Sequence, residues 1–176
     1  MADSEFDEAY QDEPGHYERE EESLGQAILG ATIQDLAPKP AARLREMGTI
    51  RAAVQLMLEN RLGAVLVERD GRPVGIFTER DLMRRVVAAG IGLDRSIEEV
   101  MTPDPETLRL DDGVAFALNR MSVGGYRHVP IVDENGTLVG IVSQREVVDY
   151  IVALLPTHVI NLPPLPDLEA RQKYGG

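Results

Sequence analysis

The feature that most constrains how this chain can fold is an internal repeat. The stretch GIFTERD, which begins at Gly75, returns 65 positions later as GIVSQRE, which begins at Gly140. At this offset residues 49–87 align with the later copy without a gap, and the turn-rich stretch 88–94 separates the two copies. Two consecutive copies of one unit are expected to adopt the same local structure and to pack against each other.

The opening part of each copy carries two helix signals. A capping hydroxyl residue, an acid three positions later and a following proline predict short helical segments that begin at Thr32 and at Ser96. A longer amphipathic helix is expected after the next turn. Its predicted cap is Thr49 in the first copy and either Asp111 or Asp112 in the second copy.

Each copy then contains the pattern of a β-hairpin. The dipeptides Asp70-Gly71 and Asn135-Gly136 each lie between two apolar runs, which is the strongest short signal for a tight hairpin turn. The strands are predicted at residues 64–67, 74–77, 129–132 and 138–142. The copies are predicted to close with amphipathic helices at residues 79–88 and 144–155.

The predicted fold class is therefore α+β, with two units of the order helix, strand, strand, helix. A unit of about 60 residues with a small sheet is marginally stable alone. We therefore expect the two small mixed sheets to pack on each other with pseudo-twofold symmetry and to form one module.

Charge divides the chain further. The formal net charge is −12, and residues 1–23 contain ten acidic residues and one arginine, so nine of the twelve net negative charges lie there. Such a segment cannot bury enough apolar surface to offset the entropy of ordering. The predicted organisation is a disordered acidic tail at 1–23, a first repeat with its lead-in at 24–92, a second repeat at 93–155 and an extended proline-rich arm at 156–176.

Several functional classes find no support in the sequence. The negative charge disfavours nucleic-acid and acidic-membrane partners. The absence of cysteine removes disulfides, thiolate metal sites and a cysteine nucleophile. The sequence contains no nucleophile elbow, Walker loop or dinucleotide-binding glycine motif. We expect a cytoplasmic protein that is not an enzyme and needs no obligatory cofactor or metal.

The repeated pattern resembles a known family. The stretch GAVLVERDGRPVGIFTERDLMRRV and its partner RHVPIVDENGTLVGIVSQREVVDYI are similar to a tandem pair of cystathionine β-synthase (CBS) domains, also called a Bateman module, over residues 31–155. The resemblance implies a stand-alone regulatory protein, expected as a homodimer, that binds AMP, ADP, ATP or S-adenosylmethionine in clefts between the repeats and signals to a partner protein. The alternative is a structural interaction module whose clefts stay empty.

The resemblance also assigns residues to a ribose site. The family motif of a Ser or Thr followed three positions later by Asp falls on Thr78 and Asp81, and Ser143 and Glu146 take the equivalent places in the second repeat. The same spacing is that of a capping box, in which the side chains bond only to their own helix. Ser143 with Glu146 fits that box directly, whereas Asp81 is a less usual capping partner. We therefore expect unequal sites, with tighter binding at Asp81.

Phosphate and adenine contacts are assigned in the same way. Arg127 and His128 correspond to places where nucleotide-binding family members carry basic residues that contact phosphate, and the arginine fork suits paired bonds to phosphate oxygens. The alternative is an arginine and a histidine exposed at a strand edge. The first repeat has Leu62 and Gly63 at these places. We expect Arg127 and His128 to serve the cleft that contains Ser143.

Four further residues complete the predicted sites. The backbone of Gly63 and Ala64 lies where the family binds adenine, and Thr49 lies where the family lines the cleft of the opposite repeat, although helix capping explains it equally well. Arg80 could contact phosphate or pair with carboxylates. Arg84 and Arg85, on the same predicted helix, are interpreted as partners of carboxylates.

Overall fold

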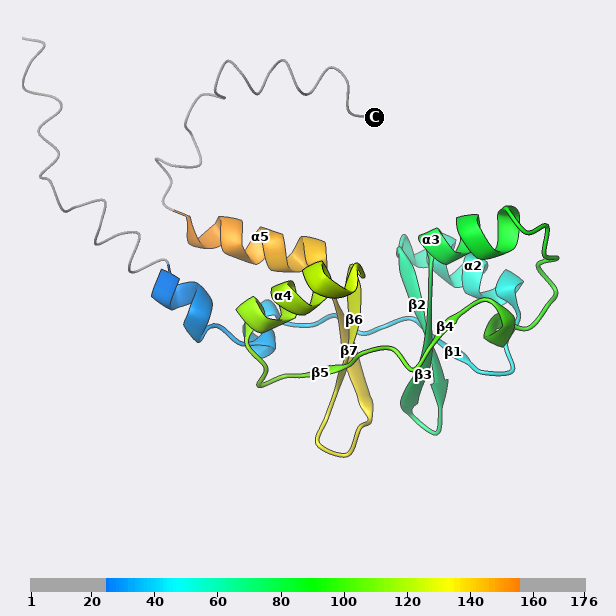
Figure 1. The fold of residues 1–176 in the computed structure, drawn as a ribbon. Coiled ribbons are helices and arrows are strands. Elements are labelled where there is room, and N and C mark those ends of the chain that lie inside the picture. Colours follow the sequence, from blue (N-terminus) through cyan, green and yellow to red (C-terminus); the bar gives the residue numbers. More distant parts are fainter. Residues whose placement is uncertain (1–24, 156–176) are drawn as a thin grey trace, which may run out of the picture.

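A computed structural model of the chain describes residues 25–155. Figure 1 shows two halves side by side, each with helices packed on one side of a small sheet. The predicted acidic tail at 1–23 and the proline-rich arm at 156–176 lie outside the described residues. The fold class is confirmed as α+β with two small mixed sheets.

The order of elements repeats as the sequence predicts. Residues 25–30 are helical. The first copy then contains η1 (Ile33–Leu36), β1 (Arg43–Arg45), α2 (Ile50–Asn60), β2 (Ala64–Arg69), β3 (Arg72–Thr78), α3 (Glu79–Asp81) and η2 (Leu82–Val87). The second copy contains η3 (Ile97–Glu99), β4 (Thr102–Pro103), β5 (Leu108–Arg109), α4 (Val114–Gly124), β6 (His128–Val132), β7 (Leu138–Ser143) and α5 (Gln144–Leu154).

The hairpins form the centre of both sheets. The first sheet has the strand order β1-β2-β3-β4 and the second has β5-β6-β7, and in each sheet the first pair is parallel and the other pairing is antiparallel. Asp70 and Gly71 both have positive φ angles, 52° and 77°. Positive values at both central residues are those of the hairpin turn that such a dipeptide favours. The predicted hairpins are confirmed.

Helix prediction succeeded in part. Thr49 caps α2 and accepts a hydrogen bond from the amide of Ala52 at 3.2 Å, as expected. The predicted aspartate cap of α4 is wrong, because Gly113 takes that position and Asp112 instead accepts a bond from the amide of Arg109 at 2.7 Å. The closing helix of the first copy also differs, since α3 has three residues and continues as the π-helical turn η2.

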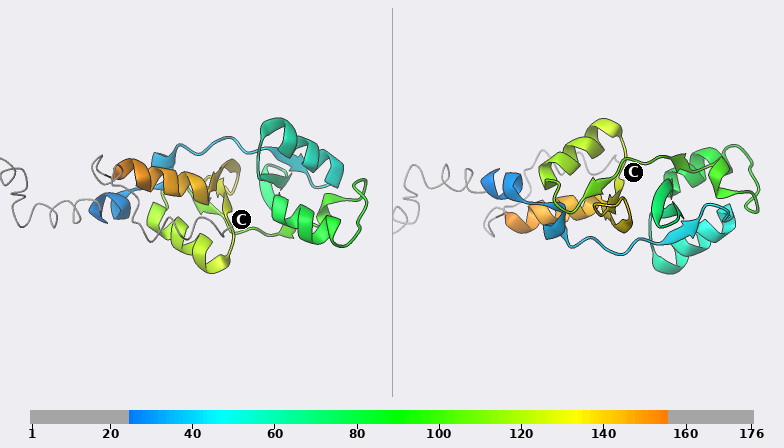
Figure 2. Two further views of the ribbon diagram at one scale, coloured as in Figure 1. Left: turned by 90° about the horizontal axis from the view of Figure 1, so that it is seen from above. Right: turned by 90° about the horizontal axis from the view of Figure 1, so that it is seen from below.

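The lead-in segments are the short stretches at η1 and at η3 that open the two repeats. They are exchanged between the halves. Ile33 of η1 is fully buried in the core of the second half, with residues of α4, β6 and α5. Ile97 and Val100, at η3, are fully buried in the core of the first half, with residues of α2, β2 and β3. Figure 2 shows the two connections crossing between the halves on opposite sides. The predicted boundaries group each lead-in with its own repeat. In the structure each lead-in packs in the core of the other repeat.

The repeated glycines make room for these crossings. β4 pairs with β3 at Gly75, and Lys39 forms a bridge to Ile141 next to Gly140. A methyl carbon added to Gly140 would lie 3.0 Å from the carbonyl oxygen of Lys39, and one added to Gly75 would overlap the side chain of Met101. The glycine in the repeated motif is thus a position where a crossing segment passes directly over the strand.

The halves share a third, smaller core between their sheets. It consists of Ala64, Leu66, Ile76 and Leu138, with Ile141 packed against it. The amide of Leu138 donates to the carbonyl of Gly71 at 2.8 Å, so backbone bonding also crosses between the halves. The two sheets therefore pack on each other in one module, as the sequence predicts.

Candidate functional site

Two cavities open along the line where the halves meet. The first cleft, with a volume of about 410 Å³, is lined by Thr78, Arg80 and Asp81 together with residues 124–128. The second cleft, with a volume of about 910 Å³, is lined by Ser143, Arg145 and Glu146 together with residues 61–64. Both volumes fall in the range of small-molecule sites.

The two clefts are built alike. Each one combines the start of the closing helix of one repeat with the loop that precedes the central hairpin of the other repeat. Ile76 lines the first cleft and Ile141, at the offset of 65, lines the second. The pseudo-twofold symmetry of the module therefore generates two equivalent sites, each with contributions from both repeats.

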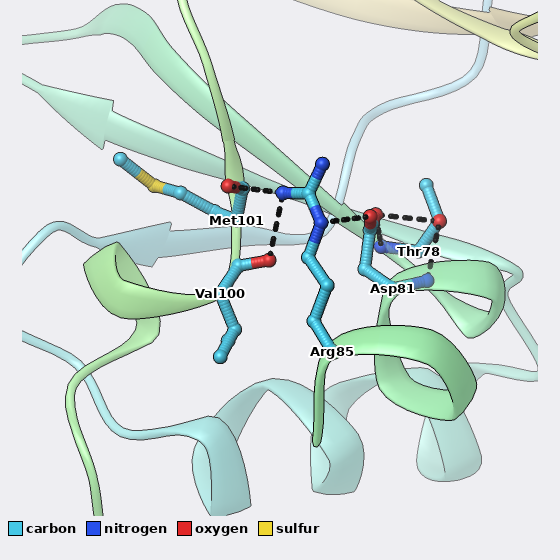
Figure 3. Close-up of polar contacts among 5 residues, drawn as sticks. All are labelled: Thr78, Asp81, Arg85, Val100 and Met101. Carbon is cyan, nitrogen blue, oxygen red and sulfur yellow. Dashed lines mark hydrogen bonds and ion pairs between the residues drawn. The ribbon is translucent and has the colours of Figure 1, made fainter. Parts of the chain in front are cut away.

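In the first cleft, Asp81 is held by a dense set of bonds. One of its carboxylate oxygens accepts from the amide and the hydroxyl of Thr78, at 3.0 and 2.7 Å. The other oxygen lies 3.3 Å from Nε of Arg85, whose NH1 group also donates to the carbonyls of Val100 and Met101 at 3.2 and 2.7 Å (Figure 3). Asp81 is buried, with 8% of its surface exposed. Arg85 thus joins this carboxylate to the exchanged lead-in.

In the second cleft, Glu146 has the same place. One oxygen accepts from the amide and the hydroxyl of Ser143 at 2.8 and 2.9 Å, and the other lies 3.1 Å from the ammonium of Lys39. Burial raises the pKa of Glu146, but the bonds from Ser143 and the nearby Lys39 outweigh it and lower this pKa below its usual value. Asp81 was expected to be a less usual capping partner than Glu146, but both pairs form complete capping boxes.

Helix capping does not use all the hydrogen-bond acceptor positions of Asp81 or Glu146. A carboxylate has about four acceptor positions. The bonds described use three of them in Asp81 and three in Glu146. These contacts therefore leave one acceptor position unused on each carboxylate.

Arg127 and His128 line both clefts. They were predicted to serve the cleft containing Ser143, and the loop that carries them also borders the first cleft, because it lies where the two cavities meet. Burial and the neighbouring Arg127 lower the pKa of His128 below its usual value, although Glu146 and Glu79 act in the opposite direction. His128 is therefore mostly neutral at pH 7 in the absence of ligand.

The remaining predicted residues are divided between the clefts. Gly63 lines both, and Ala64 lines the second, as its adenine assignment requires. Arg80 lines the first cleft and donates to the carbonyl of Gly125 at 2.8 Å, so its side chain bonds across the cleft to the other repeat. Thr49 lines neither cleft, because it caps α2 and forms a bridge to Ser96.

Among the cleft-lining residues that sequence reasoning missed are one aromatic and two cationic side chains. Tyr126 lines the first, and Lys39 and Arg61 line the second. Tyr126 could have been found, because it directly precedes Arg127 in the stretch already selected. Lys39 belongs to a lead-in whose exchange is invisible in the sequence, and Arg61 is a lone exposed basic residue of the kind that is common on any surface.

Within residues 25–155, no group of three or more histidines or acids could hold a metal ion. None of the helices described there is long and apolar enough to cross a membrane.

Comparison with known proteins identifies the family. The family model of the CBS domain matches twice, at residues 33–88 and 97–153, which is more than half of the chain. The chain belongs to the CBS domain family. Because the two matches follow the internal repeat, the protein is a tandem CBS pair of the Bateman type.

Two similar proteins differ in how much of their own length the match covers. An uncharacterized 17.7 kDa protein of Acidianus ambivalens is 39% identical over 76% of this chain and 79% of its own length. The chain spans only 23% of the longer CBS domain-containing protein CBSCBSPB5 of Arabidopsis thaliana, to which it is 28% identical over 69% of its own residues.

Solved structures of CBS pairs superimpose on this one. A CBS domain protein of Pyrobaculum aerophilum, PAE2072, in complex with AMP, has a TM-score of 0.63 and 29% identity over 70% of this chain and 99% of its own. The CBS pair of the protein MJ0100, in complex with 5′-methylthioadenosine and S-adenosyl-L-methionine, has a TM-score of 0.63 and 25% identity over 68% of this chain and 98% of its own.

Proposed function

We propose that this CBS pair is a regulatory protein that binds an adenosine-containing ligand in its two clefts and signals its bound state to a partner protein. The observation that carries the proposal is the composition of the clefts. Each one places a helix-start carboxylate of one repeat opposite a loop of the other repeat, and cationic side chains lie between them. A ligand that touches both sides reports on how the repeats are arranged.

The residues suit the parts of a nucleoside phosphate. The open acceptor positions on Asp81 and Glu146 can each accept a hydrogen bond from a ribose hydroxyl. Hydrogen bonds to a charged acceptor are stronger than those between two neutral groups. Tyr126 in the first cleft offers an aromatic face to a base, and the backbone at Gly63 and Ala64 offers polar groups in the second. Arg127 provides a planar fork for phosphate oxygens.

The ligands of similar proteins agree with this chemistry. PAE2072 is in complex with AMP, and MJ0100 with 5′-methylthioadenosine and S-adenosyl-L-methionine. All three ligands contain adenosine, although only AMP carries a phosphate. The shared part is the one that the capping carboxylates and the loop backbone would bind, so adenosine itself is the minimal ligand that we propose.

Thermal melting tests the proposal directly. Adenosine, AMP, ATP and S-adenosylmethionine at saturating concentrations should each raise the melting temperature of the full chain, since a ligand that binds only the folded state stabilises it by mass action. Guanosine and GMP serve as matched controls for the base. Binding of none of the adenosine compounds, or equal shifts with guanosine and adenosine, would refute the proposal.

A structural interaction module with empty clefts is the second candidate. It is favoured by the two capping boxes, which give Thr78, Asp81, Ser143 and Glu146 a complete structural role without any ligand. Under this alternative no adenosine compound changes the melting temperature. Replacement of Asp81 by asparagine would then alter only stability.

We also infer that the protein is a homodimer. α4 and α5 pack side by side (Figure 1) and expose large apolar side chains, Phe116 and Val123 on α4 and Val148 and Val152 on α5. A second copy would cover this surface and exclude it from water. One chain has a mass of 19.4 kDa. Sedimentation equilibrium of the full chain should give twice this mass. Substitution of Phe116 and Val152 by serine should give the monomer.

A further inference from the structure

The two clefts share a wall. Four residues line both cavities, namely Gly63, Glu79, Arg127 and His128. Gly63 and His128 are equivalent residues at the offset of 65, and a methyl carbon added to Gly63 would lie 3.4 Å from Cε1 of the His128 ring and 3.7 Å from a carboxylate oxygen of Glu79. Equivalent residues that meet must lie close to the pseudo-twofold axis, so the shared wall stands on this axis.

The wall is asymmetric in charge. Arg127 and His128 come from the second repeat, whereas the first repeat has Leu62 and Gly63 in their places. If the repeats were identical, two arginine-histidine pairs would stand at the axis, one for each cleft. This chain has a single pair, which is exposed to both cavities.

The shared wall carries one positive charge and one negative charge at neutral pH. Arg127 is its one permanent cation, and Glu79 contributes an opposing carboxylate. The other cations belong to one cleft each: the first is lined by Arg80, Arg84 and Arg85, and the second by Lys39, Arg61 and Arg145. A phosphate that reaches Arg127 from one cleft therefore turns the wall negative toward the other cleft.

We propose that Arg127 is a phosphate contact of both clefts and that two phosphorylated ligands compete for it, so that binding of one weakens binding of the other. Neutral adenosine, which brings no charge to the wall, binds the two clefts independently. The proposal rests on the function proposed above and adds how a ligand in one cleft affects binding in the other. The two binding steps are then further apart for a phosphorylated ligand than for a neutral one.

Calorimetric titration of the full chain separates these cases. The separation between the two dissociation constants should be larger for AMP than for adenosine by about fivefold or more, the lower end of usual coupling between sites. Raising the salt concentration should shrink the AMP separation and leave the adenosine separation unchanged, because only the former arises from charge. Equal separations for AMP and adenosine would overturn the proposal.

Three matched variants test the shared contact. Arg127→Gln should weaken both binding steps of AMP and leave both steps of adenosine close to wild type. Arg84→Gln and Arg61→Gln should each weaken only one step, the first and the second cleft respectively. Arg127 is exposed, so its substitution leaves the core intact, which an unchanged melting temperature would verify.

The outcomes also distinguish this proposal from the proposed function. Failure of adenosine and AMP to bind at all would refute both. Adenosine binding in two clefts, together with a loss in only one AMP step for Arg127→Gln, would overturn the shared contact and leave the proposed function standing.

Discussion

The two clefts use the same parts but fix their capping carboxylates differently. In the first, Arg85 comes from the same closing helix as Asp81 and is itself bonded to two backbone carbonyls of the exchanged lead-in. In the second, Lys39 comes from the lead-in, pairs with Glu146 directly and is mostly exposed. Duplication thus preserved the link between carboxylate and lead-in, whereas the means of making the link diverged.

This difference has a consequence for ligand binding. The Asp81 side chain is 11% exposed and that of Glu146 is 26% exposed, so a bond to Asp81 forms further from water. Polar bonds are stronger where solvent is excluded. The first cleft is also the smaller of the two. We therefore expect it to hold adenosine more tightly.

The largest predicted effect concerns the exchange of lead-ins. Ile33→Ala should lower the free energy of unfolding by about 2–5 kcal/mol, the usual cost of emptying a buried isoleucine site. Hydrogen exchange should become faster first in α4 and α5, because Ile33 packs in the core of the second half. Ile97→Ala is the matched change and should act first on α2 and β2. Faster exchange confined to each lead-in's own repeat would contradict the exchanged packing.

The next effect compares the two carboxylates. Asp81→Asn should weaken adenosine binding in the first cleft by about ten- to a hundredfold, since it removes the charge from a buried acceptor. The amide oxygen can still accept both bonds from Thr78, so the helix cap is retained. Glu146→Gln is the control for the second cleft, and calorimetry should show a loss of less than about tenfold there. Equal losses would show that the clefts are interchangeable.

A third comparison uses the paired glycines. Gly140→Ala should destabilise the fold by about 1–3 kcal/mol, because the added methyl group meets the backbone of Lys39, which cannot rotate away. Gly75→Ala should cost less, since the side chain of Met101 is flexible. Urea denaturation of both variants measures the difference. A larger loss for Gly75→Ala would mean that Met101 is held rigidly.

The smallest effect is a pH dependence at the shared wall. The pKa of His128 is lowered in the folded chain, so the unfolded state binds this proton more readily and stability falls as the pH decreases below about 6.5. Bound phosphate favours the protonated ring, so AMP affinity should rise in the same window. The gain should stay below about tenfold, the effect of one unit of pKa. The AMP affinity of His128→Gln, measured over the same pH range, gives the contribution of the phosphate's own proton. If the wild type and this variant had the same pH profile, His128 would take no part in binding.

The sequence predicted the fold better than it predicted the sites. The offset of 65 residues and the two dipeptide turns were sufficient for the hairpins, because both signals are local. The exchange of lead-ins could not be predicted, since an apolar residue such as Ile33 fits either core equally well. The shared position of Arg127 and His128 was missed for a similar reason, because it depends on how the two loops meet at the axis.

The capping residues show a different limit. The spacing from Thr78 to Asp81 is typical of both a helix cap and a ribose contact, and in the structure these side chains form the cap while they line the first cleft. Sequence reasoning treated the two roles as alternatives. They are compatible because a carboxylate has more acceptor positions than a cap requires.

The exchanged lead-ins also bear on how such a protein could arise. A chain with one copy of the unit would lack the segment that completes its own core, since that segment packs on the other copy. It could fold only by trading lead-ins with a second molecule, as an obligate swapped dimer whose stability depends on protein concentration. Joining two such units through residues 88–94 replaces that dependence with a high effective concentration within one molecule. Gene fusion would then have freed the two halves to diverge, and an arginine-histidine pair on one side of the axis alone is an arrangement that two identical subunits could never have.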